Sequence, residues 1–276
     1  MAAFERLFTE LFKQKCKKAH VIILLQFLSA FVTTVFAYFE GNMIVSGSER
    51  KIDLFLPFLF IFFFAFSFLF LLIYLIITSF QTEQINHSQT WRLAPLSDAN
   101  IYLDNTLSSF VNFIYLALLQ VISSIILFGI SYLANKRIKN GWDNMMAIIR
   151  KGNQSNATIA DLLGIALITI LLGLLVYLVI SFLNFSSQAI VDFLPAVSSK
   201  LVVTIIRLIL IIAIMWLLTE IYQFIKPVIT SPLSYMLGVE HLTIWPAVGL
   251  FTVLDVVLAA INMFLVSRFF EAKQNK

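Results

Sequence analysis

Six apolar stretches fill most of this chain, and each is long enough, or nearly so, to cross a lipid bilayer. They cover residues 20–39, 54–80, 107–133, 161–185, 201–219 and 245–267. A helix needs about 20 residues to span the hydrocarbon core, and it satisfies its own backbone hydrogen bonds. Hydrophobic residues make up 60% of the chain and charged residues 12%, which leaves little for a soluble domain. The sequence therefore predicts an all-α polytopic membrane protein, with six transmembrane helices in one transmembrane domain of residues 1–276.

The charged residues and the single cysteine indicate which partners and which covalent links the chain can have. The net charge is +4, and the basic residues lie mostly beside the apolar stretches, where their expected partner is anionic lipid and not nucleic acid. We therefore expect contact with the bilayer and no nucleic-acid binding. Cys16 has no second cysteine with which to form an internal disulfide. The first apolar run is too long for a signal peptide, so we expect it to be the first membrane helix.

Residues 1–19 carry an apolar stripe with helical spacing. The apolar positions recur every three or four residues, as on one face of a helix, and they are Phe4, Leu7, Phe8, Leu11 and Phe12. Arginine, glutamate and lysine occupy the other faces. This pattern predicts an amphipathic interfacial helix that lies along the membrane surface. The alternative is an ordinary basic flank that orients the first span.

Orientation follows mainly from the N-terminal lysine cluster. An excess of lysine and arginine marks the cytoplasmic side, so we expect both termini in the cytoplasm. The membrane that we expect to hold the chain is the plasma membrane. One region argues against this orientation. The connection 134–160, expected outside, carries the basic residues Lys136, Arg137, Lys139, Arg150 and Lys151. Within this basic outer loop, residues 141–149 mix Trp142 and other apolar residues with polar ones, which suggests a short helix on the outer leaflet.

The cytoplasmic segment 81–106 is longer than a turn between neighbouring helices requires. Pro95 ends any helix before it, and Ser97 or Asp98 can cap the next helix by accepting backbone N–H bonds. The segment therefore predicts a short helix across the inner face, a break, and then the helix that leads into the third span. Such a surface helix suits docking to a soluble partner, whereas the alternative is a simple linker.

The stretch 220–244, before the last span, is half apolar but is broken by Pro227, Pro232 and Gly238. Non-helical backbone at membrane depth needs protein or water around it. We expect a broken re-entrant segment of one or two short helices. A fifth span that is extended and kinked at Pro227 is the alternative.

Few ionisable or amide side chains lie within the spans. Arg207 of the fifth span and Asp255 of the sixth are close enough in depth to form an intramembrane ion pair. The alternative for Arg207 is a side chain that extends to the inner interface. Asn112, Gln120 and Asn184 are expected to form hydrogen bonds between helices.

Catalytic and metal-binding motifs are absent from the sequence. His20, His87 and His241 are far apart, and none belongs to a zinc-binding HExxH motif. The chain has no phosphate-binding loop, no nucleophile elbow and no acidic relay of a proton-coupled carrier. We therefore expect no enzyme activity, no metal and no cofactor in this chain.

The layout resembles the membrane subunit of a type-2 ATP-binding-cassette exporter. The matching features are the amphipathic N-terminus, the long segment after the second span and the broken stretch 220–244. Within residues 88–105, the tetrapeptide Ala94–Ser97 stands where many such permeases carry Leu-Pro-[Val/Leu]-Ser. The basic loop 134–160 departs from the short connection that is common in that family.

This resemblance implies that a coupling helix after the second span docks to a separate cytoplasmic ATPase subunit, which binds ATP and magnesium. Trp91 and Arg92 would be the foremost contacts among the expected coupling residues, which are Gln84, Gln89, Trp91, Arg92, Pro95, Ser97 and Asp98. A second permease subunit, identical or different, would complete the pathway. The alternatives are a non-transporting scaffold or immunity-type protein, and then a secondary carrier or membrane enzyme.

Overall fold

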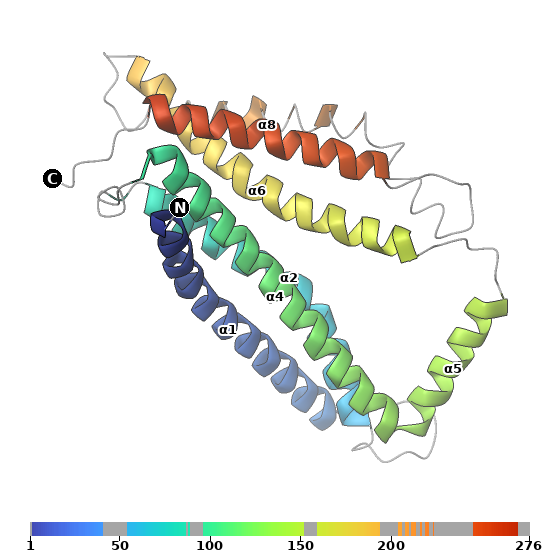
Figure 1. The fold of residues 1–276 in the computed structure, drawn as a ribbon. Coiled ribbons are helices and arrows are strands. Elements are labelled where there is room, and N and C mark those ends of the chain that lie inside the picture. Colours follow the sequence, from blue (N-terminus) through green and yellow to red (C-terminus); the bar gives the residue numbers. More distant parts are fainter. Residues whose placement is uncertain are drawn as a thin grey trace. The chain divides into compact units, whose positions relative to one another are not determined.

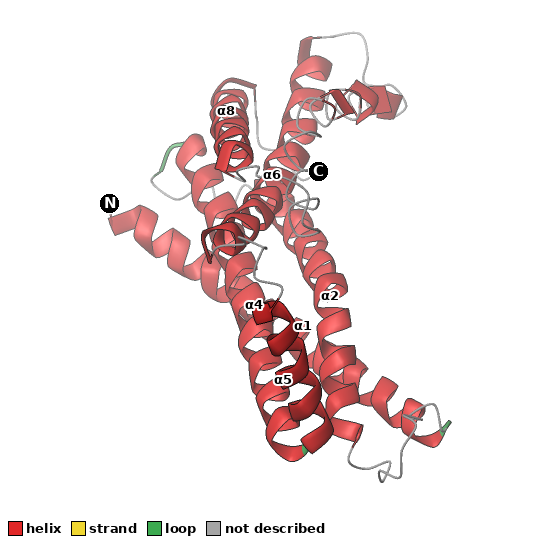
Figure 2. Cartoon of the chain, turned by 90° about the vertical axis from the view of Figure 1, so that its right-hand side faces the viewer, coloured by secondary structure: helices red, strands yellow, loops and turns green. Residues whose placement is uncertain are grey.

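The computed structural model describes residues 2–40, 54–86, 88, 96–151, 159–193 and 245–269, with isolated positions between 204 and 223. This part of the chain is almost entirely helical (Figure 2). Figure 1 labels the helices, which are α1 (Ala2–Phe39), α2 (Phe55–Asn86), α4 (Asp98–Ala134), α5 (Lys136–Lys151), α6 (Ile159–Phe193) and α8 (Trp245–Phe269). The prediction of an all-α chain is confirmed for the described residues.

Five of these helices, α1, α2, α4, α6 and α8, are long and apolar enough to cross a membrane. They coincide with five of the six predicted spans, as expected of a polytopic membrane protein. Large apolar side chains such as Phe36, Phe68 and Val256 are exposed along them, as surfaces that face acyl chains require. The predicted span 201–219 and the broken segment 220–244 lie largely outside the described residues.

The helices extend well beyond the apolar stretches that locate them. α4 has 37 residues, which is about 55 Å of helix at the usual rise and far exceeds a hydrocarbon core of about 30 Å. Residues 81–86 continue α2, and residues 98–106 begin α4. The helix predicted to lead into the third span therefore begins at Asp98, and the cytoplasmic location of segment 81–106 stays a prediction. What remains between the two helices is residues 87–97.

The N-terminal stripe begins α1 and does not form a helix of its own. α1 runs unbroken from Ala2 to Phe39, because no proline or glycine interrupts it. Leu7 and Leu11 are buried against Ile85 of α2 and Ile101 of α4. The helix predicted over residues 1–19 is thus continuous with the first span and packs in part on protein, and its location at the membrane surface stays a prediction. Of the predicted stripe, the three phenylalanines are half-buried, and they are Phe4, Phe8 and Phe12.

Most of the predicted basic loop 134–160 is helix α5, which is longer than the short helix expected at 141–149. Asn135 alone separates it from α4, and the Asn135 side-chain oxygen accepts a hydrogen bond from the Ile138 amide at 3.4 Å, as a cap does. The Trp142 ring packs edge-on to Phe128, with centroids 4.8 Å apart. These contacts attach the start of α5 to the end of α4.

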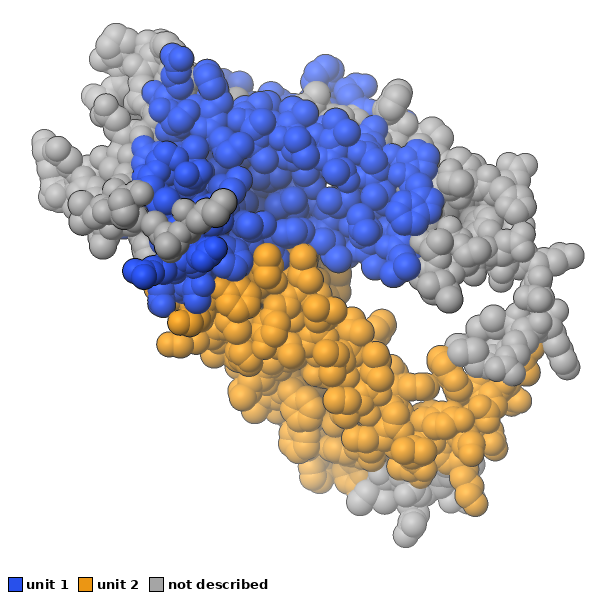
Figure 3. Space-filling model, viewed as in Figure 1, with its two compact units in different colours: residues 1–11, 79–110, 154–276 blue, residues 12–78, 111–153 orange. Residues whose placement is uncertain are grey.

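The chain divides into two compact units, which are coloured separately in Figure 3. Residues 1–11, 79–110 and 154–276 form the first unit, and residues 12–78 and 111–153 form the second. The division cuts across α1, α2 and α4, so each of these helices contributes to both units.

The first unit contains α6 and α8, which lie side by side (Figures 1 and 2). Leu175 of α6 and Phe251 of α8 are buried in the apolar cluster between them. Pro246 occupies the second residue of α8, where its missing N–H leaves no helical hydrogen bond unmade.

The second unit packs α1, α2 and α4 around Phe63 and its apolar neighbours. Three polar side chains cross this core. Gln120 of α4 donates to the Gln26 side-chain oxygen on α1 at 2.8 Å and to the Ser67 carbonyl on α2 at 3.1 Å. Gln26 in turn donates to the Ser67 hydroxyl at 2.9 Å. A polar bridge therefore joins three apolar helices at one level.

Candidate functional site

A group of buried polar side chains joins the ends of four helices in the first unit. We refer to it as the junction cluster. It contains Thr82, Glu83 and Asn86 of α2, Tyr102, Asn105 and Ser109 of α4, Ser181 of α6, and Asn262 of α8. None of these side chains is more than 9% exposed. Each of these side chains makes at least one hydrogen bond, as most buried polar groups do.

The first part of the junction cluster ties α2 to α4. The Asn105 amide donates to the Thr82 carbonyl at 2.8 Å and to the Asn86 side-chain oxygen at 2.7 Å. The hydroxyls of Thr82 and Ser109 lie 2.7 Å apart and share a hydrogen bond. The end of α2 and the start of α4 are therefore held together by side chains as well as by the short connection between them.

The second part reaches α6 and α8. The Ser181 hydroxyl donates to the Glu83 carboxylate at 2.8 Å. The Asn262 amide donates to the Tyr102 hydroxyl at 3.0 Å and to the Leu178 carbonyl at 2.9 Å. The Tyr102 ring also packs edge-on to Phe185 at 5.4 Å. One end of each of the four helices is thus bound into a single network.

This arrangement is suited to holding helices in a fixed relation. Hydrogen bonds between membrane helices contribute about 0.6 kcal/mol each on average and up to about 1.7. Those to a carboxylate, such as the bond to Glu83, are among the stronger ones. Among the described residues, no three His, Cys, Asp or Glu side chains are grouped to hold a metal ion.

The residues expected to contact an ATPase lie beside the junction cluster where they are described. Gln84 is exposed in the last turn of α2, and Asp98 is the half-buried first residue of α4. The Ser97 hydroxyl and carbonyl accept the Asn100 amide at 3.4 and 2.9 Å, which confirms the predicted N-cap. Outside the described residues lie Gln89, Trp91, Arg92 and Pro95.

The predicted ion pair is described on one side only. Asp255 of α8 is 4% exposed, and its two carboxylate oxygens have no hydrogen-bond partner among the described residues. Arg207 lies outside them, so the pair stays a prediction. Asp104 of α4, which sequence reasoning missed, is also fully buried, and its two carboxylate oxygens have no hydrogen-bond partner among the described residues.

Two of the three predicted amide links between helices are confirmed. Gln120 forms the polar bridge of the second unit, and the Asn112 amide donates to the Phe12 carbonyl of α1 at 3.2 Å. For Asn184, the structure gives a bond from Ser187 to its backbone carbonyl, so the prediction for its side chain stays open.

Sequence reasoning missed the junction cluster because the parts of α2 and α4 that contribute to it have a polar composition typical of loops. Residues 82–86 and 104–109 contain several Thr, Asn, Ser and acidic side chains, which lower the hydropathy below that of a span. The available signal was their helical spacing, since Thr82 and Asn86 lie four residues apart, as do Asn105 and Ser109.

These features define a polytopic helical membrane protein with a polar junction at one end of its helices. Comparison of the chain with family models, with curated proteins and with solved structures finds no match. The function therefore has to be inferred from the residues of this chain.

Proposed function

We propose that this protein is the permease subunit of an ATP-driven exporter of the type-2 ATP-binding-cassette class. ATP and magnesium would bind to a separate cytoplasmic subunit, and this chain would supply the pathway and its conformational change. The observation that supports the proposal most directly is the junction cluster, which joins the end of α2 and the start of α4 to α6 and α8. Along the chain, residues 87–97 connect these two helix ends.

The mechanism follows from this connection. A soluble partner that pulls on residues 87–97 acts on two helix ends at once, through Asn86 and through the Ser97 cap. Glu83 and Tyr102 pass the displacement to Ser181 and Asn262. Since packed helices move as rigid elements, a motion of the partner becomes a motion of four helices. Two permease chains would alternate the access of a central pathway in this way.

The test is a paired substitution in the connecting segment. Trp91→Ala removes a large apolar side chain, and Arg92→Glu reverses the charge of a side chain that is expected to contact the partner. We expect the ATPase subunit to dissociate and transport to stop, while the permease remains folded. Trp245→Ala with Arg268→Glu makes the same two changes at exposed positions outside this segment and should leave the complex intact. An intact, active complex after the first pair of changes would refute the proposal.

One observation favours a second candidate, a cation-coupled carrier. Asp104 and Asp255 are buried carboxyl groups without a hydrogen-bond partner among the described residues, and buried acidic groups in membrane helices often lie on ion pathways. Transport that continues without any ATPase but stops after Asp104→Asn would favour this carrier over the exporter.

A further inference from the structure

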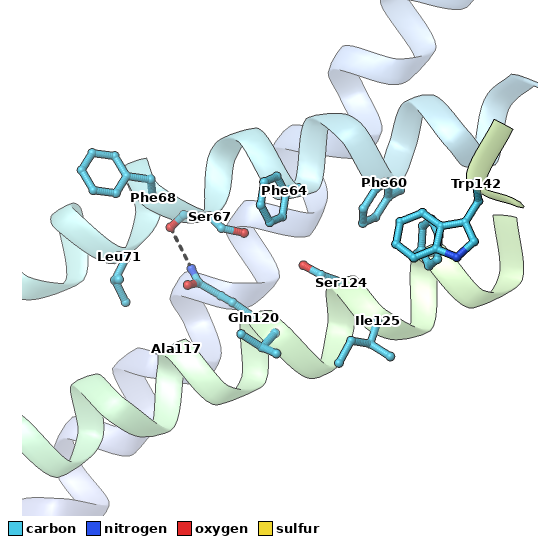
Figure 4. A pocket seen from close by; sticks show the side chains of 12 residues that line it. Phe60, Phe64, Ser67, Phe68, Leu71, Ala117, Gln120, Ser124, Ile125 and Trp142 are labelled. Carbon is cyan, nitrogen blue, oxygen red and sulfur yellow. Dashed lines mark hydrogen bonds between the residues drawn. The ribbon is translucent and has the colours of Figure 1, made fainter. Parts of the chain in front are cut away.

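The second unit contains an open apolar cavity between α2 and α4 (Figure 4). Its volume is about 510 Å³, which is within the usual range of about 300–1,000 Å³ for small-molecule sites. Phe64 and Phe68 on its wall are 64% and 70% exposed, so the cavity opens to the surroundings of the helices. The lining residues come from α2, α4 and α5, and they include Phe60, Phe64, Phe68, Gln120, Ser124 and Trp142.

The length of this cavity matches one leaflet of a bilayer. It runs along residues 60–71 of α2 and along residues 117–128 of α4. Eleven residues of helix rise about 16 Å, and one leaflet is about half of a 30 Å hydrocarbon core. Trp142 marks one end, at the corner where α5 follows α4. Tryptophan prefers the headgroup level of a membrane, so this end is the one expected at the surface.

The polar groups of the cavity are few. The Gln120 amide hydrogens are used by Gln26 and Ser67, and the Ser124 hydroxyl is directed toward the space between the two helices (Figure 4). The remaining lining is mainly aromatic and aliphatic. Such a surface suits a hydrocarbon chain and not an ion or a sugar.

Positive charge lies at the end that Trp142 marks. Lys136 and Lys139 are exposed in the first turn of α5. The Lys139 ammonium lies 6.0 Å from the Tyr132 ring centroid, and the Tyr132 hydroxyl donates to Asp143 at 3.3 Å. These contacts hold the start of α5 beside the end of α4. Exposed lysines at a membrane surface attract anionic headgroups.

We propose that this cavity holds one acyl chain of an anionic phospholipid from the leaflet beside α5, with the phosphate near Lys136 and Lys139. The cavity supplies an apolar slot as deep as one leaflet, and α5 supplies the tryptophan and the cations at its surface end. This site does not depend on the partnership with an ATPase. It takes a lipid whether or not the protein is an exporter.

The test measures the lipid that remains bound after extraction. The full-length chain is reconstituted in vesicles of equal phosphatidylglycerol and phosphatidylcholine, extracted in mild detergent and examined by native mass spectrometry. We expect about one retained phosphatidylglycerol for each chain. Ser124→Phe fills the cavity and should lower retention about tenfold, which corresponds to a loss of about 1.4 kcal/mol in binding. Ile122→Phe adds the same ring at a site 52% exposed and outside the cavity, and it should retain the lipid.

A second pair of substitutions tests the headgroup. Lys136→Gln with Lys139→Gln should remove the preference for phosphatidylglycerol over phosphatidylcholine without emptying the cavity. Ser124→Leu is the smaller filler if the phenylalanine variant does not fold. Equal retention by wild type and by the folded filler variant would overturn the proposal. So would a retained molecule other than a phospholipid, which would indicate cargo, or equal affinity for the two lipids in the wild type.

Discussion

At the scale of single residues, Glu83 shows how a carboxylate can be held among apolar helices. Its side chain is 9% exposed and accepts a hydrogen bond from Ser181 at 2.8 Å. An amide offers the same acceptor without the charge, whereas an aliphatic side chain leaves the Ser181 hydroxyl without this acceptor. The effect of a Glu83 substitution on stability therefore depends more on whether the new side chain can accept this hydrogen bond than on the size of that side chain.

We predict that Glu83→Leu lowers the free energy of unfolding by about 1–3 kcal/mol, and that Glu83→Gln changes it much less. Unfolding by a denaturing detergent, followed by circular dichroism, measures both. Ser181→Ala on the Glu83→Leu background should add almost nothing, because the shared bond is already lost. Equal losses for the leucine and glutamine variants would show that the bond to Ser181 is unimportant.

Asp255 provides the second prediction at this scale. Its buried carboxylate needs a partner, and Arg207 is the one that the sequence offers. Breaking a buried ion pair by removing one member costs about 3–5 kcal/mol. We therefore expect Asp255→Asn and Arg207→Gln each to destabilise the protein strongly. Exchange of the two residues should restore part of the loss, whereas additive damage in the exchanged protein would show that they do not interact.

At the scale of helices, α1 packs against other helices in its first turns and exposes apolar side chains in its later turns. Its first turns pack Leu7 and Leu11 against Ile85 and Ile101, and its later turns expose large apolar side chains such as Leu24. Leucine therefore has a different environment in the first turns of this helix and near its middle.

We predict that Leu11→Ala, at a position that is 0% exposed, lowers the free energy of unfolding by about 2–4 kcal/mol through the cavity it leaves. Leu24→Ala makes the same change where the side chain is 65% exposed and should stay within about 0.5 kcal/mol of wild type. Thermal unfolding of the two variants in detergent compares them directly. A similar loss at both positions would contradict the packing described for the start of α1.

Hydropathy could predict where the helices lie but not where they end. The apolar stretches located α2 and α4, because a span needs a continuous run of apolar residues. Hydropathy could not show that α2 continues to Asn86 or that α4 begins at Asp98, because a helix can continue through polar residues outside the hydrocarbon. The Ser97 cap was predictable from local chemistry. Helical spacing could have indicated a polar face at the end of α2 and the start of α4, but not its partners on α6 and α8, because residues such as Glu83 and Ser181 are far apart in the sequence.

At the scale of the whole molecule, two basic regions favour opposite orientations in the membrane. The lysines of the N-terminus favour a cytoplasmic position for the start of α1, whereas the basic residues of α5 favour the opposite orientation. The N-terminal cluster flanks the first span, which usually dominates orientation. We therefore expect α5 outside and the junction between α2 and α4 inside.

This orientation is tested with single cysteines in a Cys16→Ser background. Asn140 on α5 and Gln84 at the end of α2 are both exposed, so a cysteine at either position can react. We predict that Asn140→Cys reacts with a membrane-impermeant maleimide in intact cells, and that Gln84→Cys reacts only after permeabilisation. The reverse pattern would invert the orientation and remove residues 87–97 from the reach of a cytoplasmic ATPase.

Co-purification tests the proposal that this chain is a permease driven by a separate ATPase. The tagged full-length chain is extracted from its own cells in mild detergent, its partners are identified by mass spectrometry, and ATP hydrolysis is measured on the eluate. We predict a stoichiometric nucleotide-binding subunit with ATPase activity, lost in the Trp91→Ala, Arg92→Glu variant. A folded chain that purifies alone, from cells in which it is functional, would contradict the claim and favour a scaffold or a carrier.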